Sequence, residues 1–356
     1  MRRFVTGLFI AAVILALPSV AFAAEEKPLK IGFVYVSPAN EAGWSYAHDQ
    51  ARQELAKMPG VTTFITESVP EGADSERVIL QMARKGYDII FTTSFGYMDP
   101  TIKVAKQFPK ITFLHCSGFK TAENVSNYFG RMYQARYLTG MAAGAMTKKN
   151  VIGYAAAFPI PEVIRGINAF TMGVRAVNPK AEVRVMWTKT WYDVATEKEA
   201  GKRLVDAGCD VIAQHQDSPG PQEAAAERGV YSVGYNTDMS VFAPKAHLVA
   251  ATWDWAPFYK DIVAQVRAGT WKAGAYWPGL ESGIVNISKF GPMVPKDVQD
   301  QILKRKEEII KGQFVVFAGP VKDQKGAVRI PEGKNPADAD LLNMNWFVEG
   351  VVGSTE

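Results

Sequence analysis

Two successive series of apolar strands and amphipathic helices constrain the fold of this chain more than any other feature of its sequence. In the first series, apolar and β-branched runs such as 30–36 alternate with helical patterns such as 44–58. A second series starts at Val151, after a polar boundary at 148–150. Strands separated by helices pair in parallel, because a parallel pair needs a long crossover between its strands. The pattern therefore predicts two α/β lobes that face each other across a cleft.

The segments after residue 247 are expected to complete both lobes. We predict a first lobe over 28–147 plus about 250–280, a second lobe over 148–249 plus about 281–325, and a polar C-terminal tail over 326–356. The tail is expected to run over the surface around Trp346 and Phe347 and to fray at its end. In the helix predicted over 132–146, Gly140-x-x-x-Gly144 indicates a face that packs tightly on a sheet.

Residues 1–23 have the pattern of a secretory signal peptide. Arg2 and Arg3 precede an apolar run at 8–17, and Ala21-Phe22-Ala23 offers a cleavage site. The alternative is a transmembrane anchor, but the run is short for about 30 Å of hydrocarbon. Export permits a disulfide. Because Cys116 and Cys209 fall in different halves of the chain, we favour two buried, unpaired thiols.

Charge and motifs exclude several classes of function. The formal net charge is +4 for 356 residues, without a basic block, which argues against nucleic acid as a partner. The chain has no GxSxG, HExxH or GxGxxG motif, so no nucleophile, zinc site or dinucleotide cofactor is predicted. The four histidines, at 48, 115, 215 and 247, have no spacing for a metal. We therefore expect a binding protein without catalytic residues, cofactor or metal.

Aromatic rings beside carboxylates or amides recur in the loops after the predicted strands. Ligands of parallel sheets sit at these carboxyl ends. An aromatic face stacks on a flat ligand, and a neighbouring carboxylate or amide binds its polar edge, so a purine fits this pattern. A sugar, which also stacks on tryptophan, is the alternative. The candidate ligand-binding residues in these loops are Trp44, Phe95, Trp191, Asp217, Asn236, Asp238, Trp253 and Asp254.

The mature chain resembles the basic membrane protein family of ABC-transporter substrate-binding proteins, which includes the purine nucleoside receptor of spirochaetes. The resemblance is carried by 30–46 (KIGFVYVSPANEAGWSY), 91–100 (FTTSFGYMDP), 136–144, 160–173, 208–212 and 233–238 (VGYNTD). It implies a type I periplasmic binding protein with two Rossmann-like lobes joined by a hinge. It also implies a monomer that closes on a small ligand and delivers it to a permease in the inner membrane. Without a lipobox cysteine, the protein is expected to diffuse in the periplasm.

The resemblance also suggests roles for individual residues. Trp44 lies where the family's first-loop Phe stacks on the base, Trp191 lies near the second aromatic, and Phe95 is expected to line the wall. Asp217, Asn236, Asp238 and Asp254 are the candidates for the polar edge of the ligand, with Asp238 the strongest; Asp217 could instead cap the helix that follows it.

Departures from the family pattern bear on the ligand. Ser45 replaces an Asn, Asn236 takes an acidic position, and Trp255 takes the place of a later Lys. These changes favour a free purine base such as adenine over a nucleoside. The same residues are also compatible with a chemosensory receptor of the same fold and with an exported nucleoside hydrolase.

Overall fold

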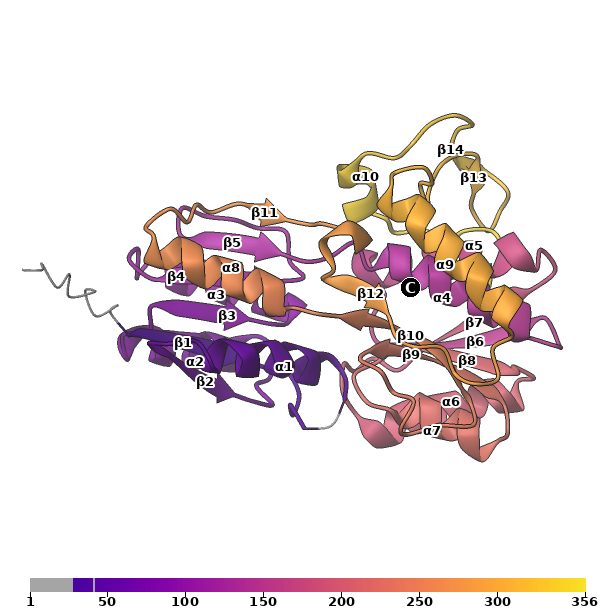
Figure 1. Ribbon diagram of the computed structural model, residues 1–356, viewed down its shortest axis with the longest axis horizontal. Helices are drawn as coiled ribbons and strands as arrows, with labels where there is room; N and C mark the ends of the chain where they lie inside the picture. The colour runs from indigo at the N-terminus through magenta and orange to yellow at the C-terminus, as the bar shows by residue number, and fades with distance from the viewer. Residues whose placement is uncertain (1–27, 41) are drawn as a thin grey trace, which may run out of the picture.

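The computed structural model describes residues 28–40 and 42–356, so the predicted signal peptide lies outside the described residues. Two α/β lobes stand end to end, with the first lobe on the left of Figure 1 and the second on the right. In the part of the chain that the structure describes, no helix is long and apolar enough to span a bilayer. The α/β class and the two parallel sheets predicted from the alternating pattern are confirmed.

The first lobe is built on a six-stranded parallel sheet in the order β11-β5-β4-β3-β1-β2. Its central strands are the apolar runs of the first series, and β3 and β4 are buried along their whole length. The strands are β1 (Leu29–Val34), β2 (Val61–Thr66), β3 (Ile89–Thr92), β4 (Thr112–Cys116), β5 (Val125–Tyr128) and β11 (Ala275–Tyr276). The helices are α1 (Trp44–Ala56), α2 (Ala73–Arg84), η1 (Phe95–Tyr97), α3 (Met98–Ala105) and α8 (Ala256–Arg267).

The second lobe has a seven-stranded sheet in the order β12-β10-β9-β8-β6-β7-β15, in which only β12 runs antiparallel to its neighbour. The strands are β6 (Val151–Ala156), β7 (Glu182–Trp187), β8 (Val211–His215), β9 (Tyr231–Asn236), β10 (His247–Trp253), β12 (Val285–Ile287) and β15 (Val351–Val352). The helices are α4 (Tyr133–Met146), α5 (Pro161–Val177), α6 (Val194–Asp206), α7 (Gly220–Glu227), η2 (Leu280–Ser282) and α9 (Lys296–Ile310).

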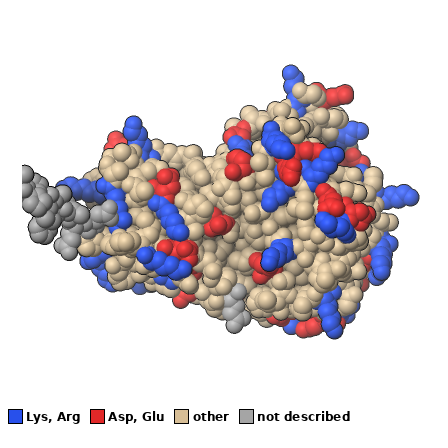
Figure 2. Space-filling model, in the orientation of Figure 1, with Lys and Arg blue, Asp and Glu red and all other residues tan. Residues whose placement is uncertain are grey.

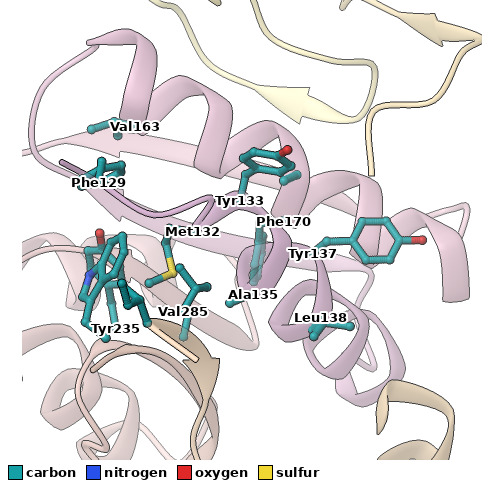
Figure 3. Packing of buried hydrophobic residues seen from close by; sticks show 14 of the residues in the cluster. Phe129, Met132, Tyr133, Ala135, Tyr137, Leu138, Val163, Phe170, Tyr235 and Val285 are labelled. Carbon is teal, nitrogen blue, oxygen red and sulfur yellow. The ribbon is translucent and has the colours of Figure 1, made fainter. Parts of the chain in front are cut away.

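Helix α4 belongs to the second lobe, which corrects the boundary that we expected near residue 147. Its glycines pack on α5 and not on a sheet: a Cβ added to Gly140 would lie 2.1 Å from the carbonyl oxygen of Phe170. A Cβ on Gly173 of α5 would lie 2.0 Å from the carbonyl oxygen of Tyr137. The two backbones therefore touch, and side chains of both helices, such as Leu138 and Phe170, join one core (Figure 3).

The C-terminal tail is integrated into the second lobe up to β15, and residues 353–356 after it belong to no helix or strand. It forms β13 (Val321–Lys322), β14 (Val328–Ile330) and α10 (Asp338–Leu342), and β15 then pairs in parallel with β7. Arg131 donates two hydrogen bonds to the Asp338 carboxylate, at 2.8 and 2.7 Å. Phe347 is buried.

Three segments cross between the lobes, at 129–132, 253–256 and 277–284. We had expected residues 250–253 in the first lobe. They lie in the second lobe, because strand β10 pairs with β9. Three crossings form a hinge that holds the lobes in register and still permits them to open. Cys116 and Cys209 lie in different lobes, and both thiols are buried and free, as predicted.

Candidate ligand-binding site

A cavity lies between the two lobes, and both contribute to its wall. Figure 2 shows that the surface is also hollowed between the lobes on the face in view. The cavity is lined by Val36, Trp44, Ser94, Phe95 and Ser117 from the first lobe and by Glu162, Trp191, His215, Asp217 and Tyr235 from the second.

The cavity lies where the order of strands in each sheet reverses. In the first lobe β1 lies between β2 and β3, and in the second β6 lies between β7 and β8. At such a switch point the two connections leave in opposite directions, and a crevice opens at the carboxyl ends of the strands. Trp44 and Phe95 follow β1 and β3, whereas Glu162 and Asp217 follow β6 and β8. The topology therefore aims these four side chains at one space.

Trp44 forms the wall of the first lobe. Its indole Nε1 donates to the carbonyl oxygen of Thr93, which fixes the ring. Behind it, Trp253 and Trp255 stack on each other with centroids 4.5 Å apart, and Trp44 meets both edge to face at 5.8 and 6.0 Å. An aromatic ring held this way presents its free surface to a ligand with little conformational entropy to lose.

Trp191 stands on the wall of the second lobe. Its ring packs against Phe158 with centroids 5.1 Å apart, and its carbonyl oxygen accepts a hydrogen bond from the Asp217 amide at 3.2 Å. The two tryptophans that we expected to stack on a ligand thus line the same cavity from opposite lobes, and Phe95 lines it beside Trp44.

Asp217 is the one predicted acidic residue that lines this cavity. Its Oδ1 accepts one hydrogen bond from Asn236 Nδ2 at 3.3 Å. Burial, reinforced by the charge of Glu197, raises the pKa of Asp217 well above its usual range. The alternative role as a helix cap is wrong, because α7 starts after Pro219 without a side-chain cap.

Asn236 and Trp253 lie behind the wall and support it. Asn236 has a positive φ of 69°, which an Asn adopts more readily than most residues. Its amide oxygen accepts from Trp253 Nε1 at 3.2 Å, while its amide nitrogen donates to Asp217. Asn236 therefore connects the hinge tryptophan to the cavity carboxyl group.

Asp238 and Asp254 do not line the cavity. Asp238 accepts from the Ser240 amide at 2.9 Å and Asp254 from the Ala256 amide at 3.1 Å, so both cap local turns. They lie in a separate groove beside α1. The chain turns at Asn236 after β9 and directs Asp238 away from the cavity, which the loop sequence by itself does not reveal.

Glu162, His215 and Tyr235 line the cavity but were not among our candidates. Glu162 is in the first turn of α5, just past the loop after β6, so the strand-end rule applied to that loop could have found it. His215 and Tyr235 lie within strands, and no signal in the sequence separates them from core residues.

The lobes are closed around this cavity. Gly43 has a φ of 92°, and a Cβ added to it would lie 1.8 Å from the carbonyl oxygen of Asp217 in the other lobe. The first lobe thus approaches the second so closely that only a glycine fits. Among the described residues, no group of His, Cys, Asp and Glu side chains could hold a metal ion.

Comparison with known proteins identifies the family. The family model described as "ABC transporter substrate-binding protein PnrA-like" (Bmp) matches residues 29–318. The chain belongs to the Bmp family. It is therefore a substrate-binding protein of an ABC transporter. The Bmp family is extracytoplasmic and consists of binding proteins rather than enzymes. Its members bind a small ligand and a permease.

Two relatives of this Bmp protein are similar over nearly their whole length. It is 45% identical to a purine-binding protein of Brucella abortus over 92% of this chain and 94% of the relative. It is 43% identical to a putative ABC transporter glucose-binding protein of Haloferax volcanii over 92% of this chain and 82% of the relative. A solved solute-binding protein of Aeropyrum pernix K1 shares the fold, with a TM-score of 0.70, 17% identity and coverage of 83% of this chain and 93% of that one.

The pH dependence of stability tests the buried carboxyl group that holds the Asp217 loop. Glu197 accepts from the Ser218 amide at 2.9 Å and from the Asp193 amide at 2.8 Å, and burial raises its pKa from 4.5 to about 7. Between pH 4.5 and about pH 7, Glu197 stays protonated in the native state but loses its proton in the unfolded state. The free energy of unfolding therefore falls as the pH rises through this range. We expect Glu197 to contribute on the order of 3 kcal/mol to this fall.

Chemical denaturation of wild-type protein and Glu197→Gln between about pH 4 and pH 8 measures the contribution. The variant should lose stability through its changed hydrogen bonds, but its stability should depend less steeply on pH. Equal slopes for the two proteins would contradict a buried Glu197 that titrates near neutral pH.

Proposed function

We propose that this Bmp protein captures a free purine base, with adenine favoured over a nucleoside, between Trp44 and Trp191. The observation that carries the proposal is a cavity with one tryptophan from each lobe and a buried carboxyl group, Asp217, on its wall. Two aromatic faces suit a flat ring, and base–aromatic stacking contributes about 1–3 kcal/mol per base.

The polar wall supports a ligand that is rich in N–H groups. Asp217 and Glu162 line the cavity with carboxyl oxygens, and Asp217 accepts from Asn236 through one oxygen. A carboxyl group in a dry cleft gains most from a partner that donates hydrogen bonds. Adenine offers an exocyclic amino group and a ring N–H to these carboxyl oxygens.

The hinge side of the cleft supports a base over a nucleoside. Trp253 and Trp255 occupy this side, and Trp255 is fully buried against His48, with ring centroids 4.9 Å apart. The name of the Brucella relative, a purine-binding protein, supports a purine ligand.

A sugar is the second candidate, because the Haloferax relative is named as glucose-binding. Tryptophan and carboxylate side chains also serve sugars. The two candidates differ in what they require: a sugar has hydroxyl groups all around and stacks with one face, whereas a base uses both tryptophans.

In this proposal the protein is a periplasmic monomer, exported by its signal peptide. It closes on the ligand and presents it to an inner-membrane permease. The ligand drives closure only to the extent that it binds the closed form more tightly than the open form. A chemosensory receptor would use the same closure. A nucleoside hydrolase would release free base from a nucleoside, which the proposed protein does not.

Calorimetric titration with adenine, hypoxanthine, guanine, adenosine and glucose tests the choice of ligand. We expect adenine to bind most tightly, adenosine more weakly and glucose not at all. Tight binding of glucose without binding of adenine would contradict the proposal, and release of adenine from adenosine would establish an enzyme.

Removing one stacking face should weaken binding. Trp191→Ala should cost roughly 1–3 kcal/mol of adenine binding. Trp187→Ala is the matched control, because Trp187 does not line the cavity. It lies at the end of β7, where its ring stacks on that of Phe347. An unchanged affinity in Trp191→Ala, measured by the same titration, would remove this residue from the site.

Closure should depend on the missing side chain of Gly43. Gly43→Ala would place a methyl group on the Asp217 carbonyl, so the closed form should be lost and the affinity for adenine should fall by about tenfold or more. Gly72→Ala is the matched control: its φ of 89° imposes similar backbone strain, and its added Cβ meets no atom within 4 Å.

Small-angle scattering with saturating adenine separates closure from folding. Wild-type protein and Gly72→Ala should become more compact when adenine is added, and Gly43→Ala should not. A compaction of Gly43→Ala equal to that of wild type would show that the two lobes close without this contact.

A further inference from the structure

A second, smaller compartment adjoins the cavity on the side of the second lobe. The two spaces share Glu162, His215 and Tyr235. The other lining residues of the inner compartment are Phe129, Met132, Tyr133, Arg136, Arg165 and Gly166. Figure 3 shows Phe129, Met132 and Tyr133 where the chain enters α4.

Arg136 brings buried hydrogen-bond donors to this compartment. The side chain is fully buried, its Nη1 donates to the Gln214 carbonyl at 2.7 Å, and its guanidinium lies 3.6 Å from the centroid of the Tyr235 ring. Its Nε and Nη2 have no hydrogen-bond partner among the described residues. A buried N–H without a partner is costly, so the site calls for an acceptor.

His215 brings a buried acceptor to the same compartment. Its Nε2 lies 3.4 Å from Glu162 Oε1, which places the ring proton on Nε2 and leaves Nδ1 as an acceptor. Burial lowers the pKa of His215 to about 4, so the ring is neutral at pH 7. Its Nδ1 is buried and has no partner among the described residues.

Gly166 makes the space in which these two groups meet. A Cβ added to this helical glycine would lie 3.8 Å from Arg136 Nε and 3.8 Å from His215 Nδ1. Both contacts are of ordinary van der Waals length, so a methyl group would fill the space without displacing either side chain. An oxygen atom in this space would have both nitrogens as neighbours, and each must come within about 3 Å of it to form a hydrogen bond.

We propose that the inner compartment is a binding site for one hydroxyl-type oxygen, which accepts from Arg136 Nε–H and donates to His215 Nδ1. Its source is a water molecule or a hydroxyl group of the ligand. The oxygen fixes the orientation of His215 and, through it, of Glu162 on the wall of the ligand cavity. Arg136 and Gly166 are thus positioning residues for the Glu162 carboxylate. The link to affinity rests on the proposed function, whereas the oxygen site itself does not.

A high-resolution crystal structure of the closed wild-type protein tests the site directly. We expect one ordered oxygen within hydrogen-bonding distance of Arg136 Nε and His215 Nδ1. It is a water molecule when the main cavity is empty or holds adenine, which has no hydroxyl group, and a water molecule or a ligand hydroxyl when the cavity holds adenosine. Absence of an oxygen there, with both nitrogens in the positions described, would overturn the proposal. Because this result does not depend on purine binding, it separates failure of the oxygen site from failure of the proposed function.

Two substitutions of Gly166 test its consequence for binding. Gly166→Ala occupies the oxygen's place with a methyl group, so adenine affinity should fall roughly tenfold. Gly166→Ser supplies a hydroxyl in its place and should recover most of the affinity, to within about threefold of wild type. Gly274→Ala is the control, because its added Cβ meets no atom within 4 Å. Alanine is favoured over glycine in a helix, so the Gly166 variants are expected to fold.

The source of the oxygen follows from two titrations of each variant, one with adenine and one with adenosine. An equal loss in Gly166→Ala for both compounds identifies a water molecule. A loss confined to adenosine identifies a hydroxyl of the ligand. Wild-type affinity of Gly166→Ala for both compounds, or a Gly166→Ser variant as weak as Gly166→Ala, would overturn the positioning role.

Discussion

A carboxyl group buried between two lobes is the constraint on which the binding site depends. Asp217 is buried in the closed form, where Asn236 donates a hydrogen bond to it. An ionised carboxylate is costly in such a place, which is why burial raises its pKa. The closed form therefore gains from a ligand that supplies hydrogen bonds. Closure and ligand recognition are, in this account, two aspects of the same desolvation.

The architecture around Asp217 makes this closure possible. Both sheets reverse their strand order beside the cleft, so loops of each lobe converge on one space. The contact between Gly43 and the Asp217 carbonyl lets the lobes approach to backbone distance. On the hinge side, the stacked Trp253 and Trp255 close the cleft behind Trp44. The stacked tryptophans therefore lie at a segment that crosses between the lobes, whereas the two carboxyl groups of the cavity, Glu162 and Asp217, belong to the second lobe.

The sequence predicted the elements well and the assembly less well. The second series begins at Val151, the first residue of β6, as the apolar run after the polar boundary predicts, and both series alternate strands and helices. The lobe to which α4 belongs could not be predicted, because it depends on backbone contacts between α4 and α5. Short strands such as β5 and β15 have too few residues for a periodic pattern.

The candidate site shows the same limit. Trp44, Phe95, Trp191 and Asp217 were found because they follow strands whose ends the pattern locates. Asp238 satisfies the same rule and still points elsewhere, since the left-handed turn at Asn236 redirects the chain. Loop position fixes where a residue is in the sheet, but not the direction of its side chain.

A crystal structure of the protein with adenine tests the central claim most directly. We expect the ring to lie between Trp44 and Trp191, with an N–H group of adenine hydrogen-bonded to the Asp217 carboxyl. Adenine bound outside this cavity, or bound within it without contact to Asp217, would contradict the account.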